Sequence, residues 1–211
     1  MARGVAASGV RLFGVASSTR DSDGGTAAEC GFVRTRDIAA LVKPVADARR
    51  ELDSSDIDLH QRIVEAAFDR GVVLPAPCGT VFRNTDQLRA WMEQNYIALS
   101  EGLQFVAGRC ELRVHLARRP TPEDVPAPTA APSVITDCFR ALRRVSTAAM
   151  TLPPIGAAEA GLFSAAFLLD RERVADFDVA VRALEQRHPA LLIRQTGPWP
   201  PYDFVRLDFG I

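Results

Sequence analysis

The sequence predicts an α+β protein of two small sheet-plus-helix domains, each a ferredoxin-like variant, joined by a Pro-rich linker. Apolar residues make up 47% of the 211 residues, which is ample material for packed cores. Strand-like runs alternate with helical patterns in both halves. Between them, Pro120–Pro132 holds five prolines among small and acidic residues, a composition typical of extended linkers. We therefore expect an N-terminal domain over 1–118, a linker over 119–133 and a C-terminal domain over 134–211.

The N-terminal domain begins with two predicted strands, Val10–Ala16 and Ala28–Thr35. The polar stretch Ser17–Gly25 separates them, so the pair could form a long-looped hairpin. Asp37 is then expected to cap a short helix, and a helical pattern would place three apolar side chains on one face: Ile38, Leu41 and Val42. These residues predict an order of strand, strand, helix.

Two longer helices are predicted next. The first is capped by Asp56 or Asp58 and runs to about Arg70, with Gly71 as a residue that ends it. A short apolar run follows at Val72–Leu74. The second helix follows Asn84, which precedes Gln87 by three residues in a capping-box pattern; one side of it is formed by Leu88, Trp91, Met92, Asn95 and Leu99.

A half-buried strand closes the N-terminal domain. Its apolar residues alternate with polar ones at period two, and they are Cys110, Leu112, Val114 and Leu116. The alternation predicts that Glu111, Arg113 and His115 point outward. The two domains are therefore both expected to be small antiparallel or mixed sheets covered on one face by helices.

The C-terminal domain is predicted as helix, strand, helix, strand, strand. Val134–Met150 forms the first helix, with Arg140, Arg143 and Arg144 on a basic face. Asp170 caps the second helix, whose apolar residues follow an amphipathic spacing, and His188-Pro189 stops it because a residue before proline is pushed out of the helical region. The predicted strands are Gly161–Leu169, Ala190–Gln195 and Phe204–Phe209.

The composition excludes several classes of function. The net charge is −1, with 25 basic and 26 acidic residues. The chain therefore lacks the excess of positive charge that is typical of proteins that bind nucleic acid or an anionic membrane. No segment approaches the roughly 20 apolar residues needed to span a bilayer, so we expect a cytosolic protein. The four cysteines lie far apart without a C-x-x-C pair, which favours buried free thiols over a zinc site.

The sequence offers no recognisable catalytic centre. The three histidines lie in separate predicted elements, and His60 is expected to be structural. No G-x-S-x-G motif occurs, and Gly79-Thr80 lacks the lysine of a phosphate loop, so a tight turn is favoured there. We therefore expect no catalytic residues, no cofactor and no metal ligands.

The most distinctive segment is Arg194–Val205, which carries three prolines, a Trp and a Tyr between two predicted strands. Proline removes backbone donors, so this segment cannot continue a helix or a central strand. One interpretation makes Trp199 and Tyr202 a structural clasp over the core. The other makes them rigid anchors for a partner, because such side chains lose little entropy on binding. The basic face of Arg140, Arg143 and Arg144 is a further candidate contact.

Several blocks in order along the chain resemble the gas vesicle synthesis protein family GvpL/GvpF. They are Arg11-Leu12-Phe13-Gly14-Val15, Arg36–Val42, His60–Ala67, Val73-Leu74-Pro75, Gly79-Thr80-Val81-Phe82, Gly108-x-x-Glu111-x-x-Val114 and Thr196–Val205. The last block is the most specific. Pro77 and Cys78 stand where the family usually has Arg and Phe, and the Pro-rich linker stands in place of a long helical segment, which indicates a short, divergent member.

The resemblance implies a two-domain, non-enzymatic accessory protein of gas vesicle assembly. Such a protein would bind the hydrophobic shell protein during nucleation or growth, together with other accessory proteins, in the cytoplasm at the vesicle. The alternative from another class is a ferredoxin-like domain that binds a small molecule or acts as a cofactor-free enzyme. That alternative requires a polar pocket between sheet and helices.

Overall fold

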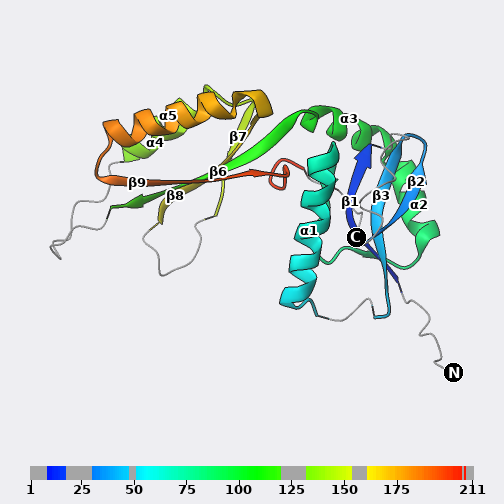
Figure 1. The fold of residues 1–211 in the computed structure, drawn as a ribbon. Helices are drawn as coiled ribbons and strands as arrows, with labels where there is room; N and C mark the ends of the chain where they lie inside the picture. The colour runs from blue at the N-terminus through cyan, green and yellow to red at the C-terminus, as the bar shows by residue number, and fades with distance from the viewer. Residues whose placement is uncertain are drawn as a thin grey trace. The chain divides into compact units, whose positions relative to one another are not determined.

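The computed structural model describes residues 9–17, 30–47, 51–119, 132–153, 161–205 and 207. The chain divides into two compact units, one of residues 1–107 with 205–211 and one of residues 108–204. Each unit holds one antiparallel sheet with helices packed against it (Figure 1). The predicted α+β class with two sheet-plus-helix units is confirmed.

The N-terminal unit is built on a sheet of five strands in the order β2-β3-β1-β4, with β5 also paired to β1. Its strands are β1 (Gly9–Ser17), β2 (Gly31–Thr35), β3 (Ile38–Val45), β4 (Val73–Pro75) and β5 (Val81–Phe82). Its helices are α1 (Ser54–Arg70), α2 (Thr85–Gln94) and α3 (Tyr96–Val106). The N-terminal strand β1 thus lies in the middle of the sheet.

The predicted helix after Asp37 is wrong, because these residues form strand β3. Arg36 and Asp37 make a two-residue turn with Arg36 at φ 55°, so β2 folds back antiparallel onto β3. The Tyr96 hydroxyl donates to the Asp37 carboxylate at 2.6 Å and fixes the turn against α3. Strand β3 is buried on both faces from Ile38 to Val42, which hides the period of two that would identify a strand. The predicted pairing of the first two strands is also wrong, since β3 lies between them.

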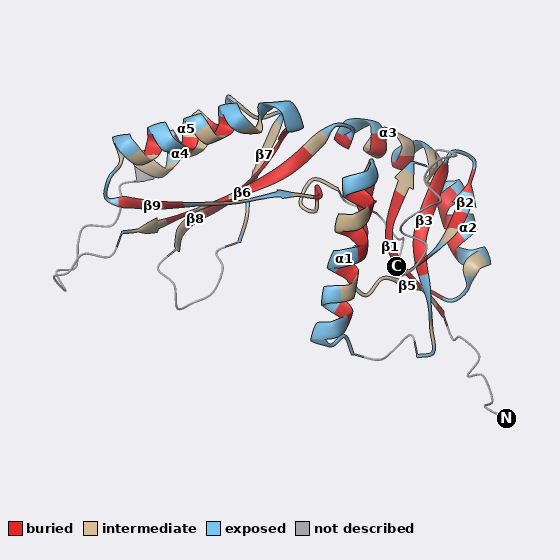
Figure 2. Ribbon diagram, viewed as in Figure 1, coloured by how far each residue is buried: buried red, intermediate tan, exposed pale blue. Residues whose placement is uncertain are grey.

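Helices cover both faces of this first sheet, whereas the sequence predicted cover on one face. Leu12 of β1 belongs to a core with Leu88, Trp91 and Leu103 of α2 and α3. Its neighbour Phe13 points to the opposite face, where its ring centroid lies 5.5 Å from that of His60 on α1. Figure 2 shows the buried strands between α1 on one side and α2 on the other. A strand buried on both faces is the physical reason for the continuous apolar runs.

The two longer helices predicted for this unit are present, with two changes at their ends. Helix α1 is capped by Asp53, which accepts from the backbone N–H of Asp56, and the Asp56 carboxylate accepts the Asp53 N–H in return. Asn84 caps α2 as predicted and accepts from the N–H of Gln87. The single long helix predicted there is two helices, because the chain breaks at Asn95.

The C-terminal unit is a βαββαβ ferredoxin-like arrangement with the strand order β7-β8-β6-β9. Its elements in chain order are β6 (Arg109–Arg118), α4 (Pro132–Arg143), β7 (Ala148–Thr151), β8 (Gly161–Asp170), η2 (Arg171–Arg173), α5 (Val174–Arg187) and β9 (Leu191–Trp199). Phe167 of β8 packs between Phe139 of α4 and Phe177 of α5, at centroid distances of 5.8 and 5.2 Å. Both helices therefore cover the same face of this sheet (Figure 1).

The predicted domain boundary differs from the division that the structure shows. Strand β6 was assigned to the N-terminal domain, but it pairs with β8 and β9 in the second sheet. The chain divides between Ala107 and Gly108, ahead of the proposed linker. Residues 120–131 of that linker lie outside the described residues. Alternation alone identified β6 as a strand, but it could not show which sheet the strand joins.

Three predicted elements of the C-terminal half also differ. The helix over Val134–Met150 ends at Arg143, and its last residues form β7 instead. Asp170 makes no side-chain cap; its carboxylate accepts from Arg109 Nε at 3.1 Å, and α5 starts after a short 3-10 turn. Within the described part of Phe204–Phe209 there is no strand. Val205 and Leu207 pack against the core of the N-terminal unit instead.

Candidate functional site

The segment that follows β9 is held against the middle of β6. Strand β9 extends past its predicted end at Gln195 to Trp199, which lies opposite Glu111. Gly197 has φ 117°, and a Cβ there would lie 2.7 Å from the Glu111 carbonyl oxygen, so only glycine fits. The strand is at the sheet edge, where Pro198 removes no donor that a neighbour needs.

Glu111 is the buried centre of a charged cluster. We call it the turn cluster, and it consists of Glu111, Arg113 and Asp203. The Glu111 side chain has no exposure to solvent, contrary to the outward orientation that alternation predicted. One carboxylate oxygen accepts the backbone N–H of Asp203 at 2.8 Å, and the other accepts from Arg113 Nε at 2.7 Å. Arg113 Nε also donates to the Asp203 carboxylate at 3.0 Å. The cluster thereby ties the turn after β9 to strand β6.

The turn cluster contains two acidic side chains and one basic side chain, and the neighbouring charges affect the pKa of Glu111. The pKa of Glu111 is raised to about 7, chiefly by burial and also by the neighbouring Asp203 carboxylate. The Asp203 N–H and the Arg113 guanidinium act in the opposite direction and lower that pKa. Glu111 is therefore poised to change protonation near neutral pH. Because it is buried completely, it cannot reach a substrate, and its role is to hold the turn.

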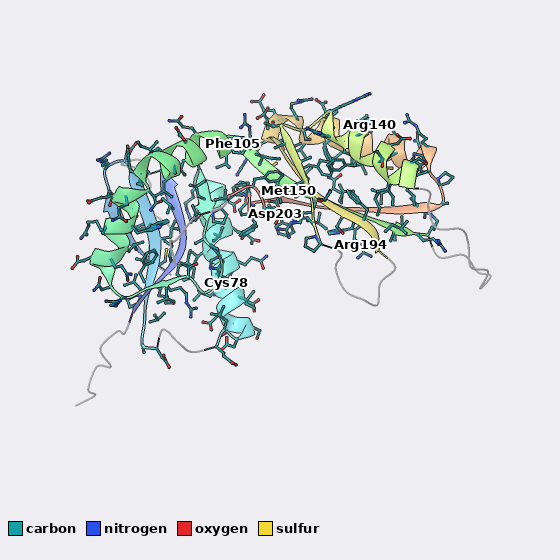
Figure 3. All side chains as sticks on the ribbon, turned by 180° about the vertical axis from the view of Figure 1, so that it is seen from behind. Cys78, Phe105, Arg140, Met150, Arg194 and Asp203 are labelled. Atoms are coloured by element: carbon teal, nitrogen blue, oxygen red, sulfur yellow. The ribbon has the colours of Figure 1, made fainter. Side chains whose placement is uncertain are left out.

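The five predicted contact residues fall into two separate groups. Trp199 and Tyr202 are half-buried beside the turn cluster, and Trp199 Nε1 donates to Thr196 Oγ1 at 3.3 Å. Arg140, Arg143 and Arg144 are exposed on α4 and in the turn after it. Arg140 pairs with Asp137 at 3.2 Å. Figure 3 shows Arg140 on the helical layer and Asp203 in the turn beyond the end of β9.

A second buried charged group lies in the N-terminal unit. Arg11 Nη1 on β1 donates to the Asp56 carboxylate at 2.6 Å, and both side chains are more than nine-tenths buried. His60, one turn further along α1, is also buried, and burial lowers its pKa. The sequence predicts Asp56 as a candidate helix cap and His60 as a structural residue. It does not identify Arg11 as their neighbour, since an Arg at the start of an apolar strand gives no signal of burial.

The cysteines show no common site. Burial raises the pKa of the Cys110 thiol to about 11 and raises that of Cys138 as well. Cys78 is exposed, so the prediction that the thiols are buried is wrong for this residue. In the part of the chain that the structure describes, no group of three or more His, Cys, Asp or Glu side chains could hold a metal ion. No helix among the described residues is long and apolar enough to cross a membrane.

Comparison with known proteins identifies the family. A model of the gas vesicle synthesis protein GvpL/GvpF family matches residues 9–127 and 127–206. The chain belongs to this family. Gas vesicle protein F2 of Halobacterium salinarum is 26% identical over 187 residues, covering 84% of this chain and 81% of that protein. Gas vesicle protein F of Haloferax mediterranei is 27% identical over 185 residues, covering 83% and 81%.

Solved structures of GvpL/GvpF proteins share the fold. The crystal structure of gas vesicle protein GvpF from Anabaena matches with a TM-score of 0.78 at 18% identity, covering 95% of this chain and 97% of that chain. GvpF from Microcystis aeruginosa matches with a TM-score of 0.75 at 16% identity, covering 95% and 100%. The fold of this chain is thus one that is seen in other gas vesicle proteins.

Proposed function

We propose that this GvpL/GvpF protein is a non-enzymatic accessory factor that binds the hydrophobic shell protein while a gas vesicle nucleates or grows. The observation that supports this most is the family match along both units. The same match supports the broader statement that the protein has a role in gas vesicles. Binding in the cytoplasm at the vesicle, with the shell protein and other accessory proteins as partners, is the finer part of the proposal.

The physical argument starts from the shell subunit. A protein that builds an apolar, β-rich wall exposes surface that aggregates before assembly. A soluble partner with free sheet edges can pair with such a segment through backbone hydrogen bonds. Both sheets of this chain are open, with β2 at one end of the first and β7 and β9 at the ends of the second. They therefore offer the geometry that the proposed function requires.

The charged groups of the chain support a structural rather than a chemical role. Glu111 has its pKa raised toward neutrality, as a general acid would, but it is completely buried and bonded to the backbone of Asp203. His60 is buried against Phe13 and Arg11. Neither side chain lines the described cavity beside α3.

The alternative, a small-molecule-binding or enzymatic domain, would use a cavity of about 270 Å³ beside α3. Its lining combines apolar and uncharged polar groups with one acid: Ser17, Asp37, Ile38, Val72, Ser100, Leu103, Gln104 and Ala107. The Asp37 carboxylate is already engaged by Tyr96. General acid–base catalysis usually needs a second titratable group, and the lining of this cavity has only the Asp37 carboxylate. We therefore favour the accessory function.

The proposed function is tested in the host and in a purified system. Deleting the gene should abolish or greatly reduce gas vesicles in electron micrographs, and the wild-type gene should restore them. Co-expression of the tagged chain with the shell protein should bring the shell protein into the soluble fraction and retain it on the tag. Normal vesicles after deletion, or a shell protein that neither co-purifies nor becomes more soluble, would count against the proposal.

The anchor role proposed for Trp199 and Tyr202 has its own test. Trp199→Ala removes the half-buried indole, while Trp199→Phe keeps an aromatic ring but loses the Nε1 donor to Thr196. If Trp199 contacts the partner, Trp199→Ala should lower recovery of the shell protein with unchanged circular dichroism and thermal midpoint. If the residue only closes the turn, Trp199→Ala should lower the midpoint, and binding should be lost only where the fold is lost.

A further inference from the structure

The outer edge of strand β2 exposes backbone groups that no described strand uses. Among the strands that the structure describes, β2 is the last of its sheet and pairs only with β3. Thr35 and Ile38 flank a two-residue turn, and such a flanking pair exchanges hydrogen bonds across the hairpin. Hydrogen-bonded and non-bonded pairs alternate along an antiparallel ladder, so the pair of Phe32 and Leu41 is non-bonded. The N–H and C=O of Phe32 therefore point away from β3, toward the free edge.

The other sheet edges are protected by devices that natural proteins use against strand addition. Strand β9 carries Pro198 and an irregular register opposite Glu111 and Arg113. Strand β4 is three residues long and ends at Pro75, β5 has two residues, and β7 has four. Strand β2 has five residues, no proline and a regular register along its whole length. It is the described edge best suited to receive another strand.

The side chains of β2 give this edge an apolar character on one face. Val33 is buried in the core with Leu88 and Trp91 of α2. Phe32 points to the other face and is half-buried, with the Arg34 guanidinium 5.6 Å from its ring centroid. A strand added beside β2 would place its side chains next to Phe32 on that face. The edge thus combines free backbone groups with an aromatic neighbour, which suits an apolar extended segment.

We propose that the β2 edge accepts an extended, apolar segment of the shell protein as an additional strand of the N-terminal sheet. This proposal rests on the proposed function and names the surface that carries it out. Main-chain hydrogen bonds to Phe32 provide affinity, and contact with the Phe32 ring favours apolar side chains in the added strand. The partner segment is held in the β conformation that it adopts in a β-rich wall.

The test compares two substitutions of the same residue in the full chain. Phe32→Pro removes the outward N–H without touching a hydrogen bond to β3, and Phe32→Ala removes the same ring but keeps the N–H. In co-purification with the shell protein, Phe32→Pro should recover about tenfold less shell protein than Phe32→Ala, the ratio expected when one strong contact is lost. Recovery that is equal for the two variants, while the wild-type chain binds, would overturn the assignment to β2 and leave the proposed function standing.

Further measurements separate the remaining outcomes. Circular dichroism and Trp fluorescence show whether Phe32→Pro folds. If it does not, Phe32→Lys keeps the N–H, places a charge at the edge and should also lower recovery relative to Phe32→Ala. Light scattering measures self-association. If the substitutions change only the self-association of the chain, the edge pairs with a second copy, and the proposal of a shell segment is wrong.

Discussion

The two units each bury a charged group, and the two groups differ in charge balance. In the N-terminal unit, Arg11 and Asp56 form a buried ion pair, and Asp56 also completes the capping box of α1. In the C-terminal unit, Arg113 faces two carboxylates, those of Glu111 and Asp203. In the turn cluster, burial and, to a smaller extent, the nearby Asp203 carboxylate raise the pKa of Glu111.

The two groups also differ in what they connect. Arg11 and Asp56 join the central strand to the first turn of the helix that covers it. Glu111 joins a strand to a turn 92 residues further along the chain. The ion pair of Arg11 and Asp56 is a contact of the core. The turn cluster holds β6 to the turn after β9, and we expect its contribution to stability to vary with pH. Substitutions that remove one charge from each group test this difference directly.

The largest effect is expected from Asp56→Ala. This change leaves the Arg11 guanidinium buried without its partner and also removes the capping box, so we expect the N-terminal unit to lose about 3–5 kcal/mol. The chain has two tryptophans, Trp91 in the N-terminal unit and Trp199 in the C-terminal unit. In a Trp199→Phe background, urea unfolding followed by Trp91 fluorescence reports on the first unit. A loss below about 1 kcal/mol would contradict the importance of this pair.

The second prediction concerns pH. A carboxyl whose folded pKa is raised binds protons more tightly in the native state, so its contribution to stability falls as pH rises from 4.5 to about 7. We expect the C-terminal unit to lose up to about 3 kcal/mol over this range relative to Glu111→Gln, which cannot titrate. The measurement is urea unfolding followed by Trp199 fluorescence in a Trp91→Phe background.

The matched variant is needed because His115 titrates in the same unit with the opposite sign. Burial and the nearby Arg113 and Arg194 lower the pKa of His115, so its contribution is lost as pH falls through 6.5. Both the wild type and Glu111→Gln keep His115, so the difference between them isolates Glu111. In the N-terminal unit, the lowered pKa of His60 predicts a loss of stability as pH falls, the reverse of the Glu111 effect. Parallel pH profiles for wild type and Glu111→Gln would contradict this prediction.

The third prediction removes the acid altogether. Glu111→Ala should cost about 1–3 kcal/mol, because the part-buried Asp203 N–H loses its acceptor while Arg113 keeps the Asp203 carboxylate. This is less than the expected cost of Asp56→Ala, since the Arg113 side chain is 32% exposed and retains a partner. Unfolding followed by Trp199 fluorescence at pH 8 gives the value. A cost larger than that of Asp56→Ala would reverse the ranking of the two buried groups.

The sequence predicted those features whose signals are local. The capping residue Asn84 and the stop at His188-Pro189 lie within a few residues of the helix ends they set, and both were found. Strand β3 was missed because burial on both faces erases its alternation. The inward orientation of Glu111 was missed because its partner Asp203 is distant in sequence, and only folding brings the two together. The family resemblance pointed to both blocks, but it could not reveal the contact between them.

The smallest effect on stability is expected at the basic face of α4. Arg140, Arg143 and Arg144 are exposed, and Arg140 contributes only a surface pair with Asp137, so the triple Ala variant should change stability by less than about 0.5 kcal/mol. If this face contacts an acidic partner, the triple variant should weaken co-purification, and added salt should weaken the wild type in the same way. Co-purification that is unchanged in the variant would assign these arginines to solvent and leave the sheet edges and the aromatic pair Trp199 and Tyr202 as candidate surfaces. One ferredoxin-like unit would then contain a helical face whose substitution leaves stability and binding unchanged and a turn cluster whose substitution alters stability.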